Sequence, residues 1–360
     1  GGLMTDPAPD IGSGNRGFVA ELDRLTRQLG QGGFRVGGLV GLLATLVVAF
    51  SLLMPTTFPH VTTLQAMMFQ LPELGLLSLA MAIPLISGGI NLAIIATPNS
   101  AALLMAWILT ALMPPDSGGM VLVLWLAGTL IAGLVLCIIV GLVTGLLVAV
   151  LGVHPILVTL GTMTLLNGLG IYFTRGRTLS GFPDALLHLS NGTMLGIPLS
   201  FILFIVVALL VHVLMTRTAL GVRIHMVGSN LEATRHSGVD IRRVLIWVYV
   251  LSSMLCFLAA VVMMARFNSA GADIAASYLL ITILAAILGG IDPYGGFGRI
   301  GGLFVALWIL QVIASGFNLM NISPHLALAS WGFILLLVMA AKRWRPAVPL
   351  RPRRPDKTES

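Results

Sequence analysis

The sequence has 360 residues, of which 57% are hydrophobic and only 9% are Asp, Glu, Lys or Arg. Soluble domains carry about 25% charged residues, so this chain could not cover a water-exposed surface and is predicted to be an integral membrane protein. Its net charge of +7 does not indicate nucleic acid binding, because the Lys and Arg residues lie between and beyond apolar runs. Cys137 and Cys256 lie inside apolar runs and the seven histidines are scattered, which predicts neither a disulfide framework nor a metal site.

Ten apolar segments are candidates for crossing a membrane, which takes about 20 residues for a hydrocarbon core of about 30 Å. In chain order they are residues 36–54, 64–87, 92–113, 120–151, 155–174, 197–215, 244–265, 278–291, 300–316 and 325–341. The fourth is long and has to tilt, kink or extend into water. The eighth and ninth segments are short, and the residues between them are rich in glycine. This pattern fits either two short spans or one broken, re-entrant unit. The sequence therefore predicts an all-α membrane protein with about ten transmembrane helices.

The Lys and Arg residues orient these spans, because cytoplasmic segments of membrane proteins are enriched in both. Seventeen of the twenty fall on one side, and only Arg175, Arg177 and Arg266 fall on the other. Both termini are therefore predicted to be cytoplasmic. The predicted parts are a partly disordered N-terminal tail (1–35), a transmembrane domain (36–341) with a cytoplasmic loop (216–243), and a basic C-terminal tail (342–360) that binds anionic lipid.

The chain carries no energy source or catalytic centre that the sequence can identify. A P-loop needs a Gly-Lys pair, yet the only lysines are Lys342 and Lys357 in the C-terminal tail. The G-x-G-x-x-G pattern at residues 296–301 lies between two apolar runs with no βαβ unit, so it predicts close helix packing and a tight turn. No nucleophile elbow or pair of intramembrane acids occurs, and the chain is predicted not to be an enzyme.

Few polar residues fall within the predicted spans. Glu73 is the only carboxylate well inside one, so it is either a functional proton or substrate group or a structural interhelical hydrogen-bond partner. Asn91, Thr97 and Asn99 lie within nine residues around a kink predicted at Pro98. Irregular backbone at membrane depth is tolerated mainly where it is buried or lines a cavity. These three residues are therefore candidates for the substrate pathway, with interhelical hydrogen bonding as the alternative.

The cytoplasmic loop 216–243 carries the signals of a short helix. Ser229 or Asn230 can cap its N-terminus, Glu232 falls in the first turn and Arg235 in the last, and Gly238 ends it. A helix of about two turns is not stable alone, so it needs a docking partner. A capped helix in the cytosol, in a chain without its own ATPase, is typical of a site where an ATPase grips a membrane subunit. The alternative is a surface helix that only anchors two spans.

Three segments resemble one family. Residues 228–241 (G-S-N-L-E-A-T-R-H-S-G-V-D-I) resemble the G-x-N-x-x-A-A-R-x-S-G-I-x-V loop of bacterial sugar ABC importer permeases of the ribose/xylose/galactose type. Residues 86–92 (I-S-G-G-I-N-L) are similar to that family's I-S-G-G-I-D-L segment, and residues 288–301 (L-G-G-I-D-P-Y-G-G-F-G-R-I-G) to its glycine-rich loop. The resemblance implies a permease of the bacterial inner membrane whose ATPase-coupling helix contains Asn230, Glu232, Ala233, Arg235, Ser237 and Gly238.

The resemblance also implies partners. They are a second permease subunit in a homodimer or heterodimer, ATPase subunits that bind ATP and Mg, and a periplasmic substrate-binding protein; the chain itself is expected to hold no cofactor. The expected mechanism is alternating access, with Glu73, Asn91, Thr97 and Asn99 as pathway candidates. The acid of the family's I-S-G-G-I-D-L segment is Asn91 here, and residues 93–99 replace the usual S-V-G, which leaves nucleosides, autoinducer 2 and branched-chain amino acids open as substrates. Thr234 in place of the second alanine of the coupling motif is tolerable on a helix. The competing interpretation is a secondary transporter coupled to protons through Glu73.

Overall fold

The structure is a computed structural model that describes residues 33–114, 118–194 and 196–343. The predicted tails therefore fall largely outside the described residues. The helices are α2 (Gly33–Leu53), α3 (Val61–Ile86), η1 (Leu92–Ile94), α4 (Ala96–Trp107), η2 (Ile108–Leu112), α5 (Gly119–Ala149), α6 (Pro155–Thr174), α7 (Asp184–Asn191), α8 (Leu199–Arg217), α9 (Ala219–Ser229), α10 (Leu231–His236), α11 (Ile241–Phe267), α12 (Tyr278–Leu288), α13 (Ile300–Leu319) and α14 (Pro324–Arg343). Two antiparallel pairs of two-residue strands join β1 (Leu179–Ser180) to β4 (Ser269–Ala270), and β2 (Thr193–Met194) to β3 (Ile197–Pro198).

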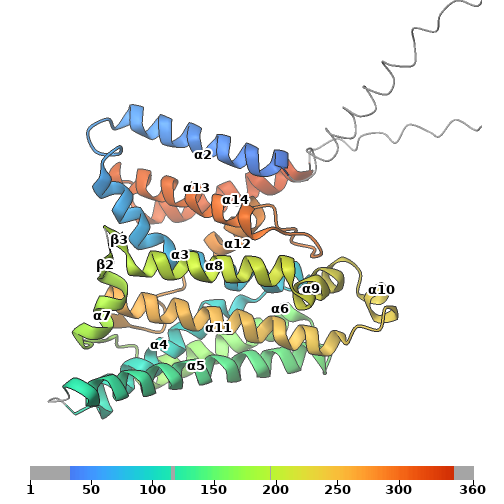
Figure 1. Ribbon diagram of the computed structural model, residues 1–360, viewed down its shortest axis with the longest axis horizontal. Coiled ribbons are helices and arrows are strands. Elements are labelled where there is room, and N and C mark those ends of the chain that lie inside the picture. Colours follow the sequence, from blue (N-terminus) through green and yellow to red (C-terminus); the bar gives the residue numbers. More distant parts are fainter. Residues whose placement is uncertain (1–32, 115–117, 195, 344–360) are drawn as a thin grey trace, which may run out of the picture.

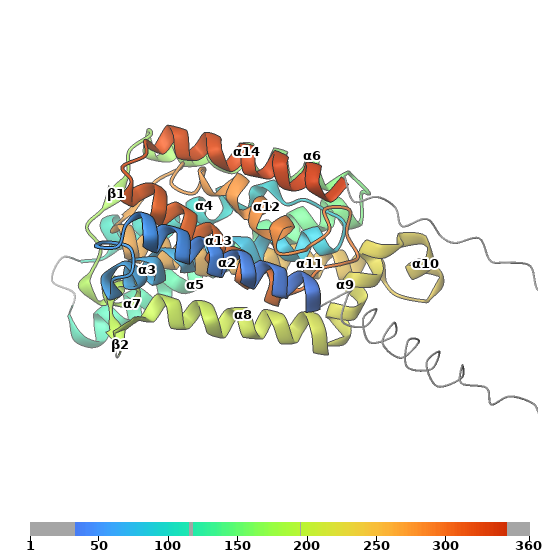
Figure 2. The same ribbon diagram turned by 90° about the horizontal axis from the view of Figure 1, so that it is seen from above.

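The long helices form one bundle in which they run along a common direction, as apolar segments must when hydrocarbon offers no partner for backbone polar groups. In Figure 1, α2 lies along one side and α5 along the opposite side, with α3, α8 and α11 between them. Figure 2 shows α14 and α8 at opposite edges. The central helix α11 packs most extensively against α5 and α3.

The helix count agrees with the predicted topology. Among the described residues, eight helices are long and apolar enough to cross a membrane, and two shorter apolar helices, Tyr278–Leu288 and His325–Val338, coincide with the eighth and tenth predicted segments. The eighth and ninth segments are two separate helices, and the ninth extends to 20 residues as α13. Helix α5 has 31 residues, which confirms an unusually long fourth span. The prediction of an all-α membrane protein is confirmed.

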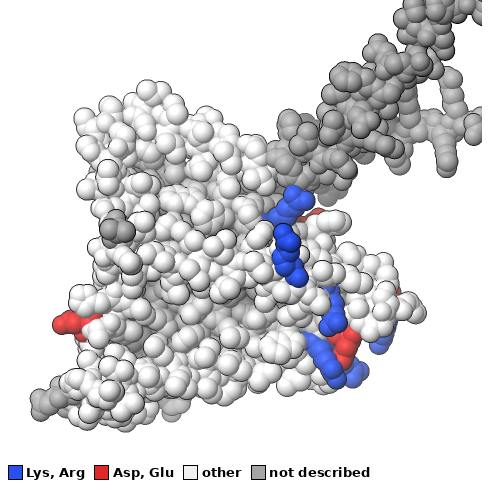
Figure 3. Space-filling model, in the orientation of Figure 1, with Lys and Arg blue, Asp and Glu red and all other residues white. Residues whose placement is uncertain are grey.

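Charged side chains mark the two ends of the bundle. On the face in Figure 3, Lys and Arg gather at the end that carries α9 and α10, while the middle of the bundle is nearly free of charge. Helix α2 begins and α14 ends at this same end (Figures 1 and 2). Because positive charge accumulates on the inner side, this is the cytoplasmic end and the opposite one is the outer end. The exposed arginines at this end include Arg217, Arg223, Arg235, Arg242, Arg243 and Arg299.

Glycine allows two close approaches inside the bundle. A Cβ added to Gly141 or Gly145 of α5 would lie 2.8 Å from Cα of Val250 and 2.9 Å from Cα of Ile246, respectively, both in α11. A Cβ on Gly302 of α13 would lie 2.1 Å from a backbone oxygen at the end of α12. Small residues are the usual means by which helices approach each other in lipid. Within the G-x-G-x-x-G pattern at residues 296–301, a Cβ on Gly296 would lie 2.7 Å from Cα of Ser229, which agrees with the predicted close packing, whereas one on Gly301 would meet nothing within 4 Å.

Helices α3 and α12 end in the same kind of turn. Gly88 and Gly290 have φ of 86° and 90°, the left-handed conformation that glycine adopts without strain. The residue after each of them donates its N–H to a carbonyl five positions back, from Gly89 to Pro84 at 2.9 Å and from Ile291 to Ala286 at 3.0 Å. This Schellman arrangement satisfies carbonyl groups that a helix end would leave unpaired.

Candidate functional site

The cytoplasmic loop contains the predicted capped helix. In α10 (Leu231–His236) the Asn230 side chain accepts a hydrogen bond from the backbone N–H of Ala233 at 3.0 Å. Glu232 lies in the first turn and Arg235 in the last, and at both positions the helix dipole stabilises the charge. Gly238 has φ of 75° and follows the helix as its stop. Of the two predicted caps, Asn230 is the one used.

Most of α10 is exposed. Thr234 is its buried residue, 2% exposed, and its hydroxyl donates to the Asn230 carbonyl at 2.7 Å. Glu232, Ala233 and Arg235 are exposed, as are Ser237 and Gly238 that follow. The helix therefore presents side chains of the predicted coupling set at the cytoplasmic end of the molecule, beyond the bundle (Figures 1 and 2).

A second helix in the same loop was not predicted. Helix α9 (Ala219–Ser229) is capped by Thr218, whose side chain accepts from Gly221 N–H at 3.2 Å. Its buried positions Ile224 and Val227 continue the spacing of Leu220, which is a helical repeat that the sequence does contain. Helix α9 packs against both α8 and α10, so it supplies the docking partner that the short helix requires.

Four glycines from three distant segments meet where α9 ends. We call Gly88, Gly228, Gly295 and Gly296 the glycine junction. A Cβ on Gly228 would lie 2.0 Å from the carbonyl oxygen of Ile86, and one on Gly295 would lie 2.7 Å from Cα of Gly88. The three segments that carry the family resemblance, distant in sequence, therefore come together at this point.

Hydrogen bonds reinforce the glycine junction. The N–H of Gly296 donates to the carbonyl of Ile86 at 2.8 Å, which ties the loop before α13 to the end of α3. The His225 ring of α9 lies with Nε2 3.3 Å from the carbonyl oxygen of Gly298 and Nδ1 2.8 Å from that of Gly221. Because these contacts are between backbone atoms, α9 cannot move far from the cytoplasmic ends of the membrane helices without breaking them. Helix α10, which packs against α9, is connected to the membrane helices through it.

The three amide and hydroxyl residues predicted for the substrate pathway are all buried. Asn91 donates to the Ser252 hydroxyl at 2.9 Å and caps η1 by accepting from Ala93 N–H at 3.1 Å. Thr97 donates to the carbonyl of Ala93 at 2.8 Å. Asn99 binds the connection between α11 and α12 through Ala272 and Ala275, neither of which is a partner of Asn91 or Thr97. Each side chain is satisfied within the protein, and their role in a pathway stays a prediction.

The prediction of a kink at Pro98 is wrong, because the irregular backbone lies earlier in the chain. Helix α4 begins at Ala96, so Pro98 lies in the first turn, where a missing N–H costs no intrahelical bond. The irregular backbone lies earlier, in residues 87–91 and in the short 3₁₀ helix η1. The chain is nevertheless broken in the region that the sequence indicated.

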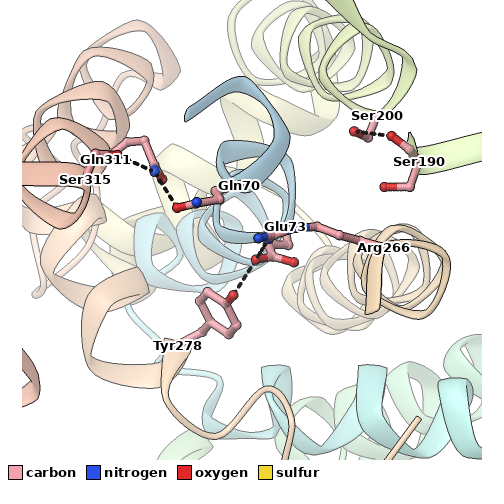
Figure 4. Close-up of polar contacts among 8 residues, drawn as sticks. All are labelled: Gln70, Glu73, Ser190, Ser200, Arg266, Tyr278, Gln311 and Ser315. Carbon is pink, nitrogen blue, oxygen red and sulfur yellow. Dashed lines mark hydrogen bonds and ion pairs between the residues drawn. The ribbon is translucent and has the colours of Figure 1, made fainter. Parts of the chain in front are cut away.

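Glu73 lies in a buried ion pair. The carboxylate is 2% exposed in α3, and its Oε1 accepts from the Arg266 guanidinium of α11 and from the Tyr278 hydroxyl of α12 (Figure 4). Its Oε2 has no hydrogen-bond partner among the described residues. Sequence reasoning missed Arg266 and Tyr278, although Arg266 was one of only three basic residues on the outer side.

A second polar contact links α3 to α13. The Gln311 amide donates to Gln70 Oε1 at 3.0 Å and to the Ser315 hydroxyl at 3.3 Å (Figure 4). This is the ordinary interhelical use of polar side chains in a membrane bundle. Within residues 33–114, 118–194 and 196–343, no group of three or more His, Cys, Asp or Glu residues could hold a metal ion.

An apolar bundle of spanning helices with a capped helix exposed at its cytoplasmic end is the architecture expected of a membrane permease subunit. A family profile described as the permease component of the branched-chain amino acid transport system matches residues 63–339. The chain belongs to this permease family. It is a transport subunit, and as a multi-pass permease it resides in the inner membrane.

Several curated relatives are named as permeases for one solute. An autoinducer 2 import system permease protein LsrD of Yersinia enterocolitica is 30% identical over 275 residues, covering 75% of this chain and 80% of that protein. The proteins of the same name from Salmonella typhi and Photorhabdus temperata are each 28% identical, covering 84% and 83% of this chain and 90% of their own lengths. No solved structure matches the chain significantly. These matches confirm the prediction of an importer permease. They do not confirm the ribose/xylose/galactose type.

Proposed function

We propose that this permease carries a small neutral hydroxylated solute, a sugar or autoinducer 2, which a periplasmic binding protein delivers. The observation that carries the proposal is the capped helix α10, joined through the glycine junction to membrane helices of an importer permease. The names of the relatives support autoinducer 2, and the sequence motifs support a sugar. A neutral solute is favoured because the buried charges of Glu73 and Arg266 compensate each other.

The proposed complex has two permease subunits, either identical or similar, and two ATPase subunits that bind ATP and Mg. No cofactor is assigned to this chain. The exposed α10 is the proposed seat for the ATPase, and Asn230, Glu232, Ala233, Arg235, Ser237 and Gly238 form or flank it. When the ATPase dimer closes, α10 and α9 move together, and the glycine junction transmits the movement to the ends of α3 and α13.

The proposed pathway contains Glu73, Asn91, Thr97 and Asn99. Glu73 joins α3 to α11 and α12, Asn91 joins the chain before η1 to α11, and Asn99 joins α4 to the connection that follows α11. The Thr97 hydroxyl donates to the carbonyl of Ala93 in η1. When these helices separate, the same amide, hydroxyl and carboxylate groups become available to solute hydroxyls. Buried polar groups need such partners, because leaving one unpaired costs about 1–3 kcal/mol.

Replacing Glu232 or Arg235 by alanine is expected to uncouple ATP hydrolysis from transport. Both side chains are exposed, so the fold is unaffected within about 0.5 kcal/mol. We expect ATP hydrolysis by the complex to continue while solute uptake per ATP falls at least about fivefold, equivalent to about 1 kcal/mol of lost coupling. The measurement is parallel uptake and phosphate release in proteoliposomes. The matched control is H236A, an exposed neighbour on α10, and equal uptake in all three variants would contradict the role of these charges.

The proposed function is tested by isolating the chain in mild detergent and identifying associated proteins by mass spectrometry. We expect a P-loop ATPase that is lost when residues 230–237 are scrambled. The substrate is then identified by adding labelled autoinducer 2 or ribose with the co-purified binding protein. If the chain comes out alone and drives uptake in ATP-free proteoliposomes under a proton gradient, the importer assignment is wrong and Glu73 becomes the proton site.

A further inference from the structure

The connection between α11 and α12 is irregular except for the two-residue strand β4. We call residues 266–278 the outer segment. Helix α12 has 11 residues, so it rises only about 16 Å and covers about half of the hydrocarbon core. The outer segment therefore has to enter the membrane from the outer side before α12 begins. Non-helical backbone at that depth is tolerated only where protein buries it or it lines a cavity.

Glu73 holds both ends of the outer segment. Arg266, in the last turn of α11, and Tyr278, the first residue of α12, both donate to the same carboxylate oxygen (Figure 4). One side chain of α3 thus fixes the point where the outer segment leaves α11 and the point where it becomes α12. Losing that carboxylate would free both ends at once.

Asn99 of α4 holds the middle of the outer segment. Its amide N–H donates to the carbonyl of Ala272 at 2.7 Å, and its amide oxygen accepts from Ala275 N–H at 3.1 Å. The two bonds mimic the pairing of a neighbouring strand, so Asn99 takes the place of a backbone partner. Ala275 is fully buried, so its backbone N–H has no access to water and depends on Asn99 for its hydrogen bond.

The outer segment also covers a cleft. Its lining includes Pro98, Asn99 and Ala102 of α4, Met263 of α11 and Ile274 of the outer segment, and it leaves only about 10 Å³ for water-sized molecules. Pockets that hold small molecules usually enclose about 300–1,000 Å³, so this cleft has to widen before it takes a solute. The widening has to move the outer segment, because that segment forms one of its walls.

We propose that the outer segment is the outer gate of the translocation pathway, held shut by Glu73 and Asn99. The proposal rests on the proposed function, because a gate needs a solute to pass. The four attachments to Glu73 and Asn99 are hydrogen bonds, one of them within an ion pair, and each can be exchanged for water or a solute hydroxyl when the segment moves. The outer segment is also tied to residues 179–182 by the β1–β4 pairing and by the Phe182 N–H, which donates to Asn268 Oδ1 at 3.0 Å. The gate lies at the end of the bundle opposite α10, as alternating access requires.

The gate is tested by chemical labelling from outside. Ala102 is 7% exposed beneath the outer segment, and the native Cys137 and Cys256 are buried. A102C is introduced, and its reaction with a membrane-impermeant maleimide is followed in right-side-out vesicles. We expect slow labelling of A102C alone, and labelling at least about tenfold faster when E73Q is added. Y278F and N99A disturb the fold less, because they leave the Glu73–Arg266 ion pair in place. Each is expected to raise the labelling rate about fivefold, as loss of about 1 kcal/mol of hydrogen bonding predicts.

The controls separate the gate from the rest of the proposal. T193C, exposed on β2, which pairs with β3 and not with the outer segment, should label at one rate in every background. In the complete complex, addition of ATP and vanadate should accelerate A102C labelling as strongly as E73Q does. If an ATPase co-purifies but A102C stays slow in all three variants and with nucleotide, the gate is overturned while the proposed function stands. If no ATPase co-purifies, the proposed function fails whatever the labelling shows.

Discussion

Replacing Gly228 by alanine is expected to lower import at least about tenfold. The new Cβ would lie 2.0 Å from the Ile86 carbonyl oxygen and 2.5 Å from the Gly296 nitrogen. Both obstacles are backbone atoms and cannot rotate away, so α9 has to leave the end of α3. Overpacking of this kind costs about 1–3 kcal/mol, which is enough to loosen the glycine junction. Uptake in proteoliposomes that contain the ATPase and the binding protein measures the effect.

The glycine junction predicts which activity survives in this variant. Helix α10 is unchanged in G228A, so the ATPase should still co-purify, whereas scrambling residues 230–237 should release it. The matched control is G161A in α6, where an added Cβ meets nothing within 4 Å. Import that is equally normal in G228A and G161A would show that the junction transmits nothing.

Removing either charge of the Glu73–Arg266 pair alone should strongly destabilise the protein. In E73M the Arg266 guanidinium loses its counterion, and in R266M the Glu73 carboxylate, which is 2% exposed, loses its counterion. Breaking a buried pair from one side costs about 3–5 kcal/mol, whereas replacing both partners by apolar residues is often nearly neutral. We therefore expect each single variant to unfold at least about 5 °C below the parent, and E73M/R266M to recover most of that loss.

Two native thiols make this measurement straightforward. Cys137 and Cys256 are both buried, so a thiol-reactive dye reports unfolding of the detergent-solubilised protein during heating. The four proteins form a double-mutant cycle, in which the coupling energy is the non-additive part. Additive losses in the cycle would mean that the two side chains do not form a pair in the folded protein.

The local parts of the fold could be predicted from the sequence because their signals are local. Apolar length gave the ten segments, and the distribution of Lys and Arg gave their orientation. The cap of α10 was predictable because Asn230, Glu232 and Arg235 lie within six positions of each other. Helix α9 was not predicted, because its repeat of Leu220, Ile224 and Val227 spans only eight residues and begins directly after the apolar helix α8.

The contacts between distant segments could not be predicted in the same way. Glu73 and Arg266 are 193 positions apart, and no periodicity or spacing connects a single acid to one arginine among several. The same holds for Asn99 and Ala272, where the partner is a backbone carbonyl that any residue carries. For the glycine junction, the sequence showed three glycine-rich segments but not that they touch. Such pairings depend on how the helices pack, which is a property of the whole bundle.

The length of α5 makes the thickness of the bilayer part of the mechanism. Its 31 apolar residues rise about 46 Å, roughly 16 Å more than a typical hydrocarbon core. A helix that exceeds its bilayer tilts or thickens the lipid around it, and the tilt changes with acyl-chain length. Because Gly141 and Gly145 hold α5 against the backbone of α11, tilting of α5 also displaces the helix that leads into the outer segment. Transport by this permease should therefore differ between thin and thick membranes of otherwise identical headgroups.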